Sequence, residues 1–243
     1  ELRQFESSIY SINKVERSKI RLQRLKFINQ VDVKKNIIDE ENGDIDIDFI
    51  LEETQSGEFK VGAGYSDSSG AIFNIKVEQD NFLGKGNNVG VEIEKSSYKK
   101  LIRYRNTNPY FTKDGISKST SIVFSETDVS STSTASYISD TIAYGIDYNV
   151  PISETRSYGY GGELILTDYT TTVGSPENVT SFINKYGNSH FGLMIRASLS
   201  EDTRNRTVYA QQGKRESISS NLFIKPDLDY SYASIKFTGE YNT

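Results

Sequence analysis

The side chains that could do chemistry are few in this chain. His190 is the only histidine and there is no cysteine, which excludes a cysteine nucleophile and most zinc sites. No Gly-x-Ser-x-Gly segment is present, and Gly84-Lys85-Gly86 lacks the spacing of a phosphate-binding loop. Three aspartates alternate along one segment: Asp44, Asp46 and Asp48. They could attract a cation, although a solvated strand face is the commoner reason for such a pattern. We therefore expect a protein that is not an enzyme and has no cofactor or metal site.

Composition and charge narrow the class of protein further. A net charge of -5 argues against nucleic acid as a partner. The 35% of hydrophobic residues and the mean hydropathy of -0.53 resemble those of a soluble protein, and no apolar stretch is long enough for a transmembrane helix. Residues 1–24 are charged throughout and lack the apolar centre of a signal peptide, so we expect a cytoplasmic protein or a mature fragment. The absence of cysteine favours an oxidising compartment.

Period-two alternation is the dominant pattern from Glu58 onward. Residues 138–150 show it best, because Ile142, Tyr144 and Ile146 share one side of the segment with other apolar residues, and only Asp140 departs from the pattern. Such alternation predicts β-strands with one apolar and one polar face. Repeated strands of this kind can cross a bilayer as a β-barrel, although a soluble barrel or sandwich would give the same alternation.

Turn signals divide this region into ten predicted strands. They lie near residues 58–66, 70–80, 87–95, 98–107, 116–128, 137–150, 155–169, 188–200, 215–224 and 231–241. The longest polar connections, 129–136 and 170–187, are both odd-numbered in this series, whereas the tight turn at 151–154 is even-numbered. Short turns on one side and long loops on the other are typical of outer-membrane barrels.

The first 54 residues have a different, mixed pattern, and we place a boundary near residues 54–57. An Asn-x-x-Glu pattern at Asn13 predicts the N-cap of a helix. The apolar face of this helix holds Val15, Leu22 and Leu25. Two strands should follow at 31–37 and 44–53, joined by an Asn-Gly turn that favours positive φ. We expect a small α+β domain over residues 1–54 and a β domain over residues 55–243.

Four segments together resemble the BamA family of outer-membrane protein assembly factors. The opening of the family's barrel is similar to Glu58–Tyr65 followed by Gly70, to Gln79-Asp80-Asn81-Phe82-Leu83-Gly84-Lys85-Gly86, and to Asn108-Pro109-Tyr110-Phe111-Thr112-Lys113-Asp114-Gly115. The last periplasmic POTRA repeat of the family is similar to Leu22-Gln23-Arg24-Leu25-Lys26-Phe27 and the strand pair after it. The order of helix, hairpin, Gly-rich first strand and these two turns is specific, and the resemblance covers nearly the whole chain.

This resemblance implies a fold, a location and a set of partners. The fold is mainly β: an antiparallel transmembrane β-barrel, about ten of its sixteen strands present, preceded by a truncated α+β POTRA domain. The location is the outer membrane of a Gram-negative bacterium, with the POTRA part in the periplasm. The partners are unfolded outer-membrane β-barrel proteins, periplasm-facing assembly lipoproteins and outer-membrane lipid. Secretion transporters of the same superfamily share this plan, so a transporter or channel is the alternative function.

By the same resemblance, the first barrel strand is the candidate for pairing with a substrate strand at a lateral seam. Unpaired backbone groups cost several kcal/mol each in lipid, so an inserting barrel needs a templating edge. Two glycines weaken the packing of this strand, which favours a change of partner; a bend or close packing in the barrel wall is the alternative reason for them. The predicted seam residues are Phe59, Lys60, Val61, Gly62, Ala63, Gly64 and Tyr65.

Two surfaces of the POTRA part are candidates for partner binding. Arg3-Gln4-Phe5-Glu6 resembles the segment where the family's last repeat contacts its lipoprotein, with Glu6 at an acidic position; a solvated helix face is the alternative. The strand at 31–37, which carries Val31 and Val33, is expected to accept an extended substrate along a free edge.

Overall fold

The computed structural model describes residues 2–23, 25–39, 42–67, 70–129, 136–204, 212–228 and 230–242. Within these ranges the chain divides into two compact units, Glu1–Gly57 and Glu58–Thr243. Neither unit contains a described helix with the length and apolarity needed to cross a bilayer.

The first unit is one helix packed on an antiparallel hairpin. Its elements are α1 (Ile12–Gln23), β1 (Ile28–Asp39) and β2 (Asp44–Glu53). α1 contacts β1, and the small buried core holds Leu22, Ile28 and Val31. The hairpin turn places Gly43 at a φ of 72°, the positive value that its Asn-Gly sequence predicts.

The helix begins earlier than the Asn13 signal predicts. The carbonyl oxygen of Ser11 accepts hydrogen bonds from the backbone N–H groups of Lys14 and Val15, both at 3.0 Å. Ser11 therefore stands at the N-terminal end, and Asn13 lies inside the helix. Leu25 comes after the end of α1 and packs on the core from the following turn rather than from the helix face. The N-cap prediction is wrong, because Asn13 and Glu16 both lie inside the helix. An Asn and a Glu three residues apart can occur within the first turns of a helix as well as at its N-cap.

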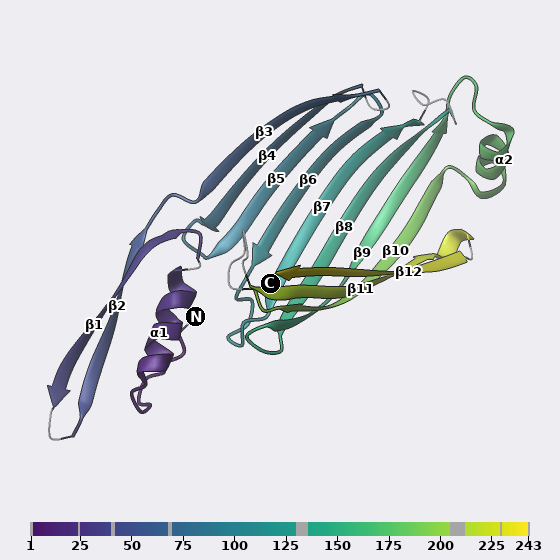
Figure 1. Ribbon diagram of the computed structural model, residues 1–243. Helices are drawn as coiled ribbons and strands as arrows, with labels where there is room; N and C mark the ends of the chain where they lie inside the picture. Colours follow the sequence, from purple (N-terminus) through teal and green to yellow (C-terminus); the bar gives the residue numbers. More distant parts are fainter. Residues whose placement is uncertain are drawn as a thin grey trace. The chain divides into compact units, whose positions relative to one another are not determined.

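The second unit is a ten-stranded antiparallel sheet whose strands follow one another in chain order (Figure 1). This confirms the strands predicted from alternation. Their bounds are β3 (Gly57–Ser66), β4 (Gly70–Phe82), β5 (Asn87–Lys95), β6 (Lys99–Asn108), β7 (Ser117–Asp128), β8 (Tyr137–Pro151), β9 (Arg156–Thr171), β10 (Ser189–Asp202), β11 (Gly213–Lys225) and β12 (Tyr230–Asn242). β3 and β12 are the two edges of the described sheet.

Both ends of the strands carry short and long connections, so the predicted asymmetry of short turns on one side and long loops on the other is wrong; the connection between β10 and β11 is longer than residues 129–136. The end that carries the short β4–β5 and β8–β9 turns is called the near rim here, and the opposite end the far rim. The far rim carries a helix, α2 (Glu177–Tyr186), between β9 and β10, and a single 3₁₀ turn, η2 (Pro226–Leu228), between β11 and β12. The prediction of a plain polar loop at 170–187 is thus corrected to a connection with a ten-residue helix. Most of the other long connection, residues 130–135, lies outside the described residues.

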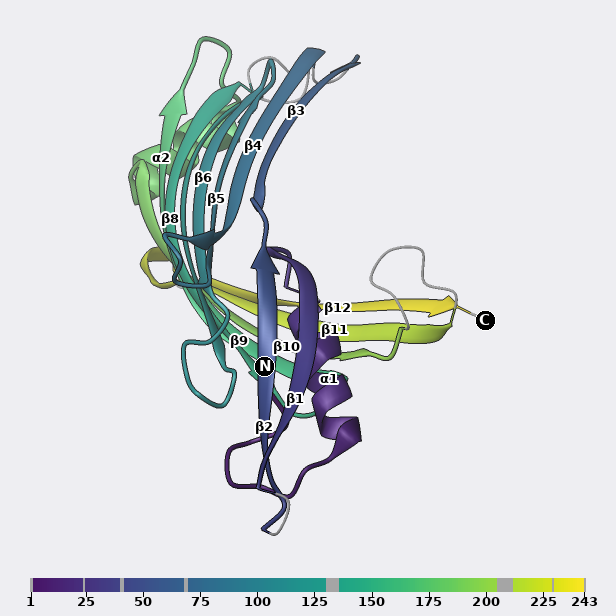
Figure 2. The same ribbon diagram turned by 90° about the vertical axis from the view of Figure 1, so that its left-hand side faces the viewer.

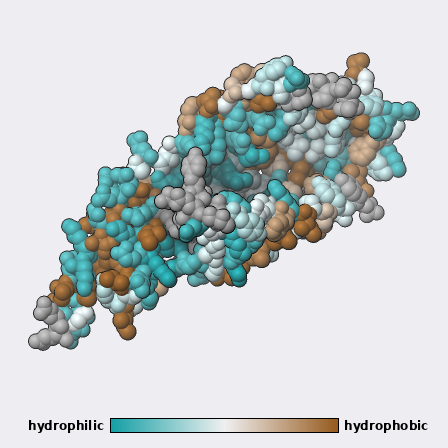
Figure 3. Space-filling view, viewed as in Figure 1, coloured by the Kyte–Doolittle hydropathy of each residue, from teal (hydrophilic) through white to brown (hydrophobic). Residues whose placement is uncertain are grey.

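The sheet is strongly curved and has its apolar side chains on the exposed face. Figure 2 shows the strand direction swinging from β3 to β12, as expected for part of a barrel wall. On β8, Ile142 is 51% exposed and Tyr144 is 44% exposed, while Ala143 between them is buried on the other face. The hollowed face is lined largely by hydrophilic side chains (Figure 3). No second layer of the described residues covers the apolar face, so the sandwich alternative fails.

Candidate functional site

The outward, apolar face of the sheet forms a band with a different type of border at each rim. At the far rim Lys100 and Glu126 form an ion pair of 2.8 Å on neighbouring strands, and Asp140 and Asp168 continue this row on β8 and β9. Asp140, the exception in the alternation, thus marks the end of the apolar band. Aromatic rings border the near rim, with contacts of 5.3–5.9 Å among Phe111, Tyr148, Tyr158 and Tyr160. Amphipathic rings of this kind are favoured at a lipid–water interface.

The height of this band fits the hydrocarbon layer of an outer membrane. On β9 the outward residues run from Leu166 to Tyr158, and the flanking charged positions are Asp168 and Arg156. At a rise of about 3.3 Å per residue and a tilt of about 40°, the apolar positions span about 20 Å and the charged positions about 30 Å. An outer-membrane barrel has an apolar belt of about 25 Å, which lies between these two values.

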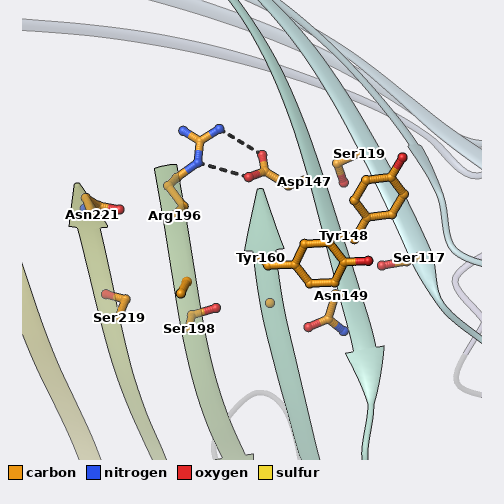
Figure 4. Close-up of a pocket in the computed structure, with 12 residues that line it drawn as sticks. Ser117, Ser119, Asp147, Tyr148, Asn149, Tyr160, Arg196, Ser198, Ser219 and Asn221 are labelled. Carbon is orange, nitrogen blue, oxygen red and sulfur yellow. Dashed lines mark hydrogen bonds and ion pairs between the residues drawn. The ribbon is translucent and has the colours of Figure 1, made fainter. Parts of the chain in front are cut away.

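The hollowed face carries a cluster of ion pairs around Arg196 on β10. Its guanidinium lies 3.0 and 3.1 Å from the two carboxylate oxygens of Asp147 on β8 (Figure 4). It also lies 2.6 Å from a carboxylate oxygen of Glu163 on β9. The three side chains are all partly buried. Two nitrogens of the guanidinium bind one carboxylate and the third nitrogen binds the other carboxylate, which holds the guanidinium in one orientation. The cluster thus joins three successive strands.

Glycines make the room for this cluster. A Cβ at Gly161 would lie 2.8 Å from the Cα atom of Asp147 and would overlap its carboxylate, and a Cβ at Gly145 would lie 2.8 Å from the hydroxyl of Ser121. Beside the cluster is a cavity of about 320 Å³ whose walls include Ser198, Ser219 and Asn221. A polar cavity on this face is consistent with water inside a barrel lumen.

The predicted seam residues all lie on β3, at the edge of the sheet. Phe59, Val61 and Tyr65 are 68%, 65% and 77% exposed, respectively. Lys60 forms an exposed ion pair with Glu58 at 2.7 Å. The structure therefore brings the predicted seam residues together on one uncovered strand, with β4 on one side and no further strand of the described sheet on the other.

The two seam glycines are not required by sterics. Gly62 and Gly64 have no positive φ, so their backbone conformation is available to any residue. A Cβ at Gly62 would make only an ordinary contact of 3.8 Å with the Cβ of Asn74, and a Cβ at Gly64 would meet nothing within 4 Å. Packing against β4 therefore does not explain these glycines, in contrast to Gly161.

The predicted partner residues of the first unit differ in accessibility. Glu6 is exposed, and exposed apolar side chains lie near it in sequence at Phe5 and Ile9. Val31 is only 1% exposed and Val33 is half-buried, so their side chains serve the core of this unit. A substrate strand at β1 would have to pair through backbone groups alone.

The remaining candidate residues do not assemble a catalytic or metal site. The three aspartates of β2 alternate along an exposed strand face, and Asp48 accepts a hydrogen bond of 2.9 Å from the side-chain amide of Asn36. In the ranges that the structure describes, no group of three or more His, Asp or Glu side chains could hold a metal ion. His190 is buried at the far rim, where its ring contacts an aspartate from a distant turn.

Sequence reasoning missed the partners of Arg196. Period two does place Arg196, Asp147 and Glu163 on the polar face of their strands. Which of the many polar-face residues meet depends on strand register, and alternation carries no information on register beyond parity. A signal was nevertheless present in the Gly residues at every second position of β9 beside these charges.

Comparisons with known proteins agree with this geometry. A family model described as the Omp85 superfamily domain matches residues 81–243. The outer membrane protein assembly factor BamA of Neisseria meningitidis is 29% identical over 189 residues, or 77% of this chain, and that of Buchnera aphidicola is 31% identical over 110 residues, or 45% of this chain. The chain spans 24% and 18% of the length of these two relatives.

Solved structures show the same fold. The crystal structure of BamA from Haemophilus ducreyi lacking POTRA domains 1–3 has a TM-score of 0.77 and 23% identity, with 98% of this chain and 47% of that chain covered. CdiB from Acinetobacter baumannii has a TM-score of 0.56 and 12% identity, with 97% of this chain and 45% of that chain covered.

Proposed function

This chain belongs to the Omp85 superfamily, and from this membership together with its similarity to BamA assembly factors we propose that it is part of an assembly factor that folds and inserts β-barrel proteins. The sheet is part of an outer-membrane β-barrel of a Gram-negative bacterium, with hydrocarbon against its apolar face. The first unit is proposed to be the end of the last POTRA repeat, on the periplasmic side, and the protein is proposed to have no enzymatic activity.

The observation that carries this proposal is the similarity to BamA assembly factors, and β3 is the strand proposed to do the work. A nascent barrel protein cannot leave backbone N–H and C=O groups unpaired in lipid, because each costs several kcal/mol. β3 is the first strand of the described sheet, and the exposed Phe59, Val61 and Tyr65 continue the outward apolar face onto it. A substrate strand that pairs with β3 would satisfy both its backbone and its apolar face while it enters the membrane.

The seam is tested by valine substitutions in the full-length protein. Gly62→Val together with Gly64→Val adds β-propensity of about 1 kcal/mol at each site without a steric clash, so release of the current partner strand should slow about 30-fold. We expect a matching drop in the rate at which a reporter barrel protein is assembled in membranes.

Gly90→Val is the matched control, because Gly90 lies on the interior strand β5 and a Cβ there meets only a carbonyl at 3.7 Å. This variant should assemble the reporter normally. Normal assembly by the double variant would remove the basis for β3 as the seam.

A secretion transporter or channel is the second candidate, since the fold is also similar to that of CdiB. Reconstitution in planar bilayers separates the two functions. A transporter should give a large, steady conductance, whereas an assembly factor should be occluded for most of the time and should respond to crosslinking of its seam.

The exposed segment around Glu6 is proposed to bind an assembly lipoprotein. Its support is the carboxylate of Glu6 beside the exposed apolar side chains of Phe5 and Ile9, a combination that suits a protein partner better than water. Glu6→Lys should reduce co-purification of the lipoproteins, and the same reversal at the exposed Glu16 on α1 should leave it unchanged. Equal recovery from both variants would discard this surface.

A further inference from the structure

His190 is the most deeply buried ionisable side chain in the described part of the sheet. It is the second residue of β10, at the far rim, and is 2% exposed. Nδ1 lies 2.7 Å from the Oδ2 atom of Asp227 in the η2 turn. Nε2 lies 3.0 Å from the carbonyl oxygen of Gly187, the residue that follows α2. One ring thus joins three elements that are up to 37 residues apart in the sequence.

The two partners of the ring fix its protonation state. A carbonyl oxygen can only accept a hydrogen bond, and so can an ionised carboxylate. Only the imidazolium form, with a proton on both ring nitrogens, can donate a hydrogen bond to both partners. A neutral ring has one N–H group, so it would leave a nitrogen lone pair facing an oxygen lone pair at one of the two contacts.

The surroundings of the ring suit a cation. Aromatic rings of Phe182 from α2 and Tyr169 from β9 lie 5.2 and 5.7 Å from it, within the range of cation–π contacts. Partial burial opposes the ionisation of Asp227, yet its hydrogen bond from His190 and its backbone hydrogen bonds hold the pKa of this carboxyl below its usual range. The oxygen that contacts Nδ1 also accepts the backbone N–H of Phe191 at 3.2 Å.

The other ionisable groups near the ring are one phenol and two ammonium groups. Tyr169 contributes a phenol, which ordinarily ionises near pH 10. Lys225 on β11 has its ammonium group 5.9 Å from the Tyr169 ring, and Lys185 of α2 lies over Tyr186 at 4.7 Å.

We propose that His190 is a charged latch, whose imidazolium ring ties the end of α2 and the η2 turn to the start of β10, so that the order of the far rim depends on the protonation of this side chain. Loss of the proton towards alkaline pH removes one of the two hydrogen bonds. The bond to the carboxylate is the stronger of the two when it is charge-assisted, so the carbonyl of Gly187, and α2 with it, is released first.

The first test reads the ring directly. The full-length protein, labelled with ¹⁵N in its histidines and placed in lipid nanodiscs, gives a His190 signal that is identified by its loss in His190→Gln. We expect both ring nitrogens to be protonated at about pH 6 and one to be deprotonated at about pH 9. A ring with one bare nitrogen at about pH 6 would overturn the proposal.

The second test reads the rim. A spin label on the exposed Asn184 of α2, introduced as Asn184→Cys, should be immobile at about pH 6 and mobile at about pH 9. His190→Gln and Asp227→Asn should each abolish the pH response of the label, and either variant carries the test if the other fails to fold. Lys185→Gln, which removes a charge of α2 without touching the latch, should keep the pH response. A label with the same mobility at both values, or a pH response that survives in both latch variants, would contradict the latch.

Discussion

An arginine scan of the outward face tests the most basic claim about this sheet, that lipid contacts it. Leu164 on β9 points outward and is 48% exposed. The centre of the apolar band on this strand is at Gly162, midway between the charged Asp168 and Arg156, and Leu164 lies two residues from it. Its Cα is thus about 5 Å from the centre of the band once the strand tilt is included. Leu164→Arg should destabilise the folded barrel by about 2–4 kcal/mol, because a guanidinium at that depth is costly in hydrocarbon.

Two matched variants separate depth from face. Tyr158→Arg places the same charge on the outward face of the same strand at the aromatic near rim, and it should cost no more than about 1 kcal/mol. Ser198→Arg places it on the hollowed face, where the side chain lines the cavity of about 320 Å³. It should cost little, because water in a lumen can solvate the charge.

The measurement is equilibrium unfolding in urea of the full-length protein in lipid vesicles, followed by the change in gel mobility between folded and unfolded barrel. A loss of 2–4 kcal/mol shifts the folding equilibrium about 30- to 700-fold. Equal stability of Leu164→Arg and Ser198→Arg would refute the reasoning, because the outward side chains would then face water or another protein layer.

Three further predictions concern the hollowed face and the far rim. Gly161→Ala should lower the free energy of unfolding by about 1–3 kcal/mol in the same urea assay, because its Cβ overlaps the neighbouring strand. Gly162→Ala is the control, since the nearest atom to its Cβ lies at 3.4 Å, and it should not lower that free energy. Equal losses in the two variants would show that the strands relax freely. Arg196→Met should lower the free energy of unfolding by about 2 kcal/mol. This is less than the loss of a fully buried ion pair would cause, because the carboxylates that the variant leaves unpaired are partly hydrated. An unchanged unfolding midpoint would mean that the cluster adds nothing to stability. The carboxyl of Asp227 has a lowered pKa in the folded protein, so its stabilising effect is complete above the unfolded value of about 4 and is lost as the pH falls through the lower folded value. The free energy of unfolding in the urea assay should therefore fall more in acid for the unmodified protein than for Asp227→Asn, and equal losses would argue against this carboxylate as an anchor.

The strands could be predicted from the sequence because a membrane-spanning strand displays its two faces as strict alternation. That pattern located all ten strands and assigned residues such as Ile142 and Arg196 to the correct faces. It could not reveal which residues meet, since a contact such as that between His190 and Asp227 depends on a turn 37 residues away. α2 was missed because its ten residues contain two asparagines and a threonine, which have low helix propensity and are also frequent in loops. Tertiary contacts of Phe182 with the sheet supply what local propensity lacks.

The energetics of the β3 edge limit what its glycines can do. Roughly half of the residues in a ten-residue edge strand direct an N–H and a C=O group outward, and each such group costs several kcal/mol if left unpaired in lipid. Opening the edge into hydrocarbon would therefore cost tens of kcal/mol, whereas a glycine weakens a strand by about 1 kcal/mol. Gly62 and Gly64 cannot open a seam on their own. They can affect which strand pairs with β3 only when an incoming strand replaces the existing partner one hydrogen bond at a time. The free energies of the backbone hydrogen bonds lost and gained then nearly cancel, so that differences of about 1 kcal/mol decide which partner stays. If β3 acts as the proposed seam, these energies favour a step in which the substrate strand displaces the closing strand over one in which the barrel first opens to lipid.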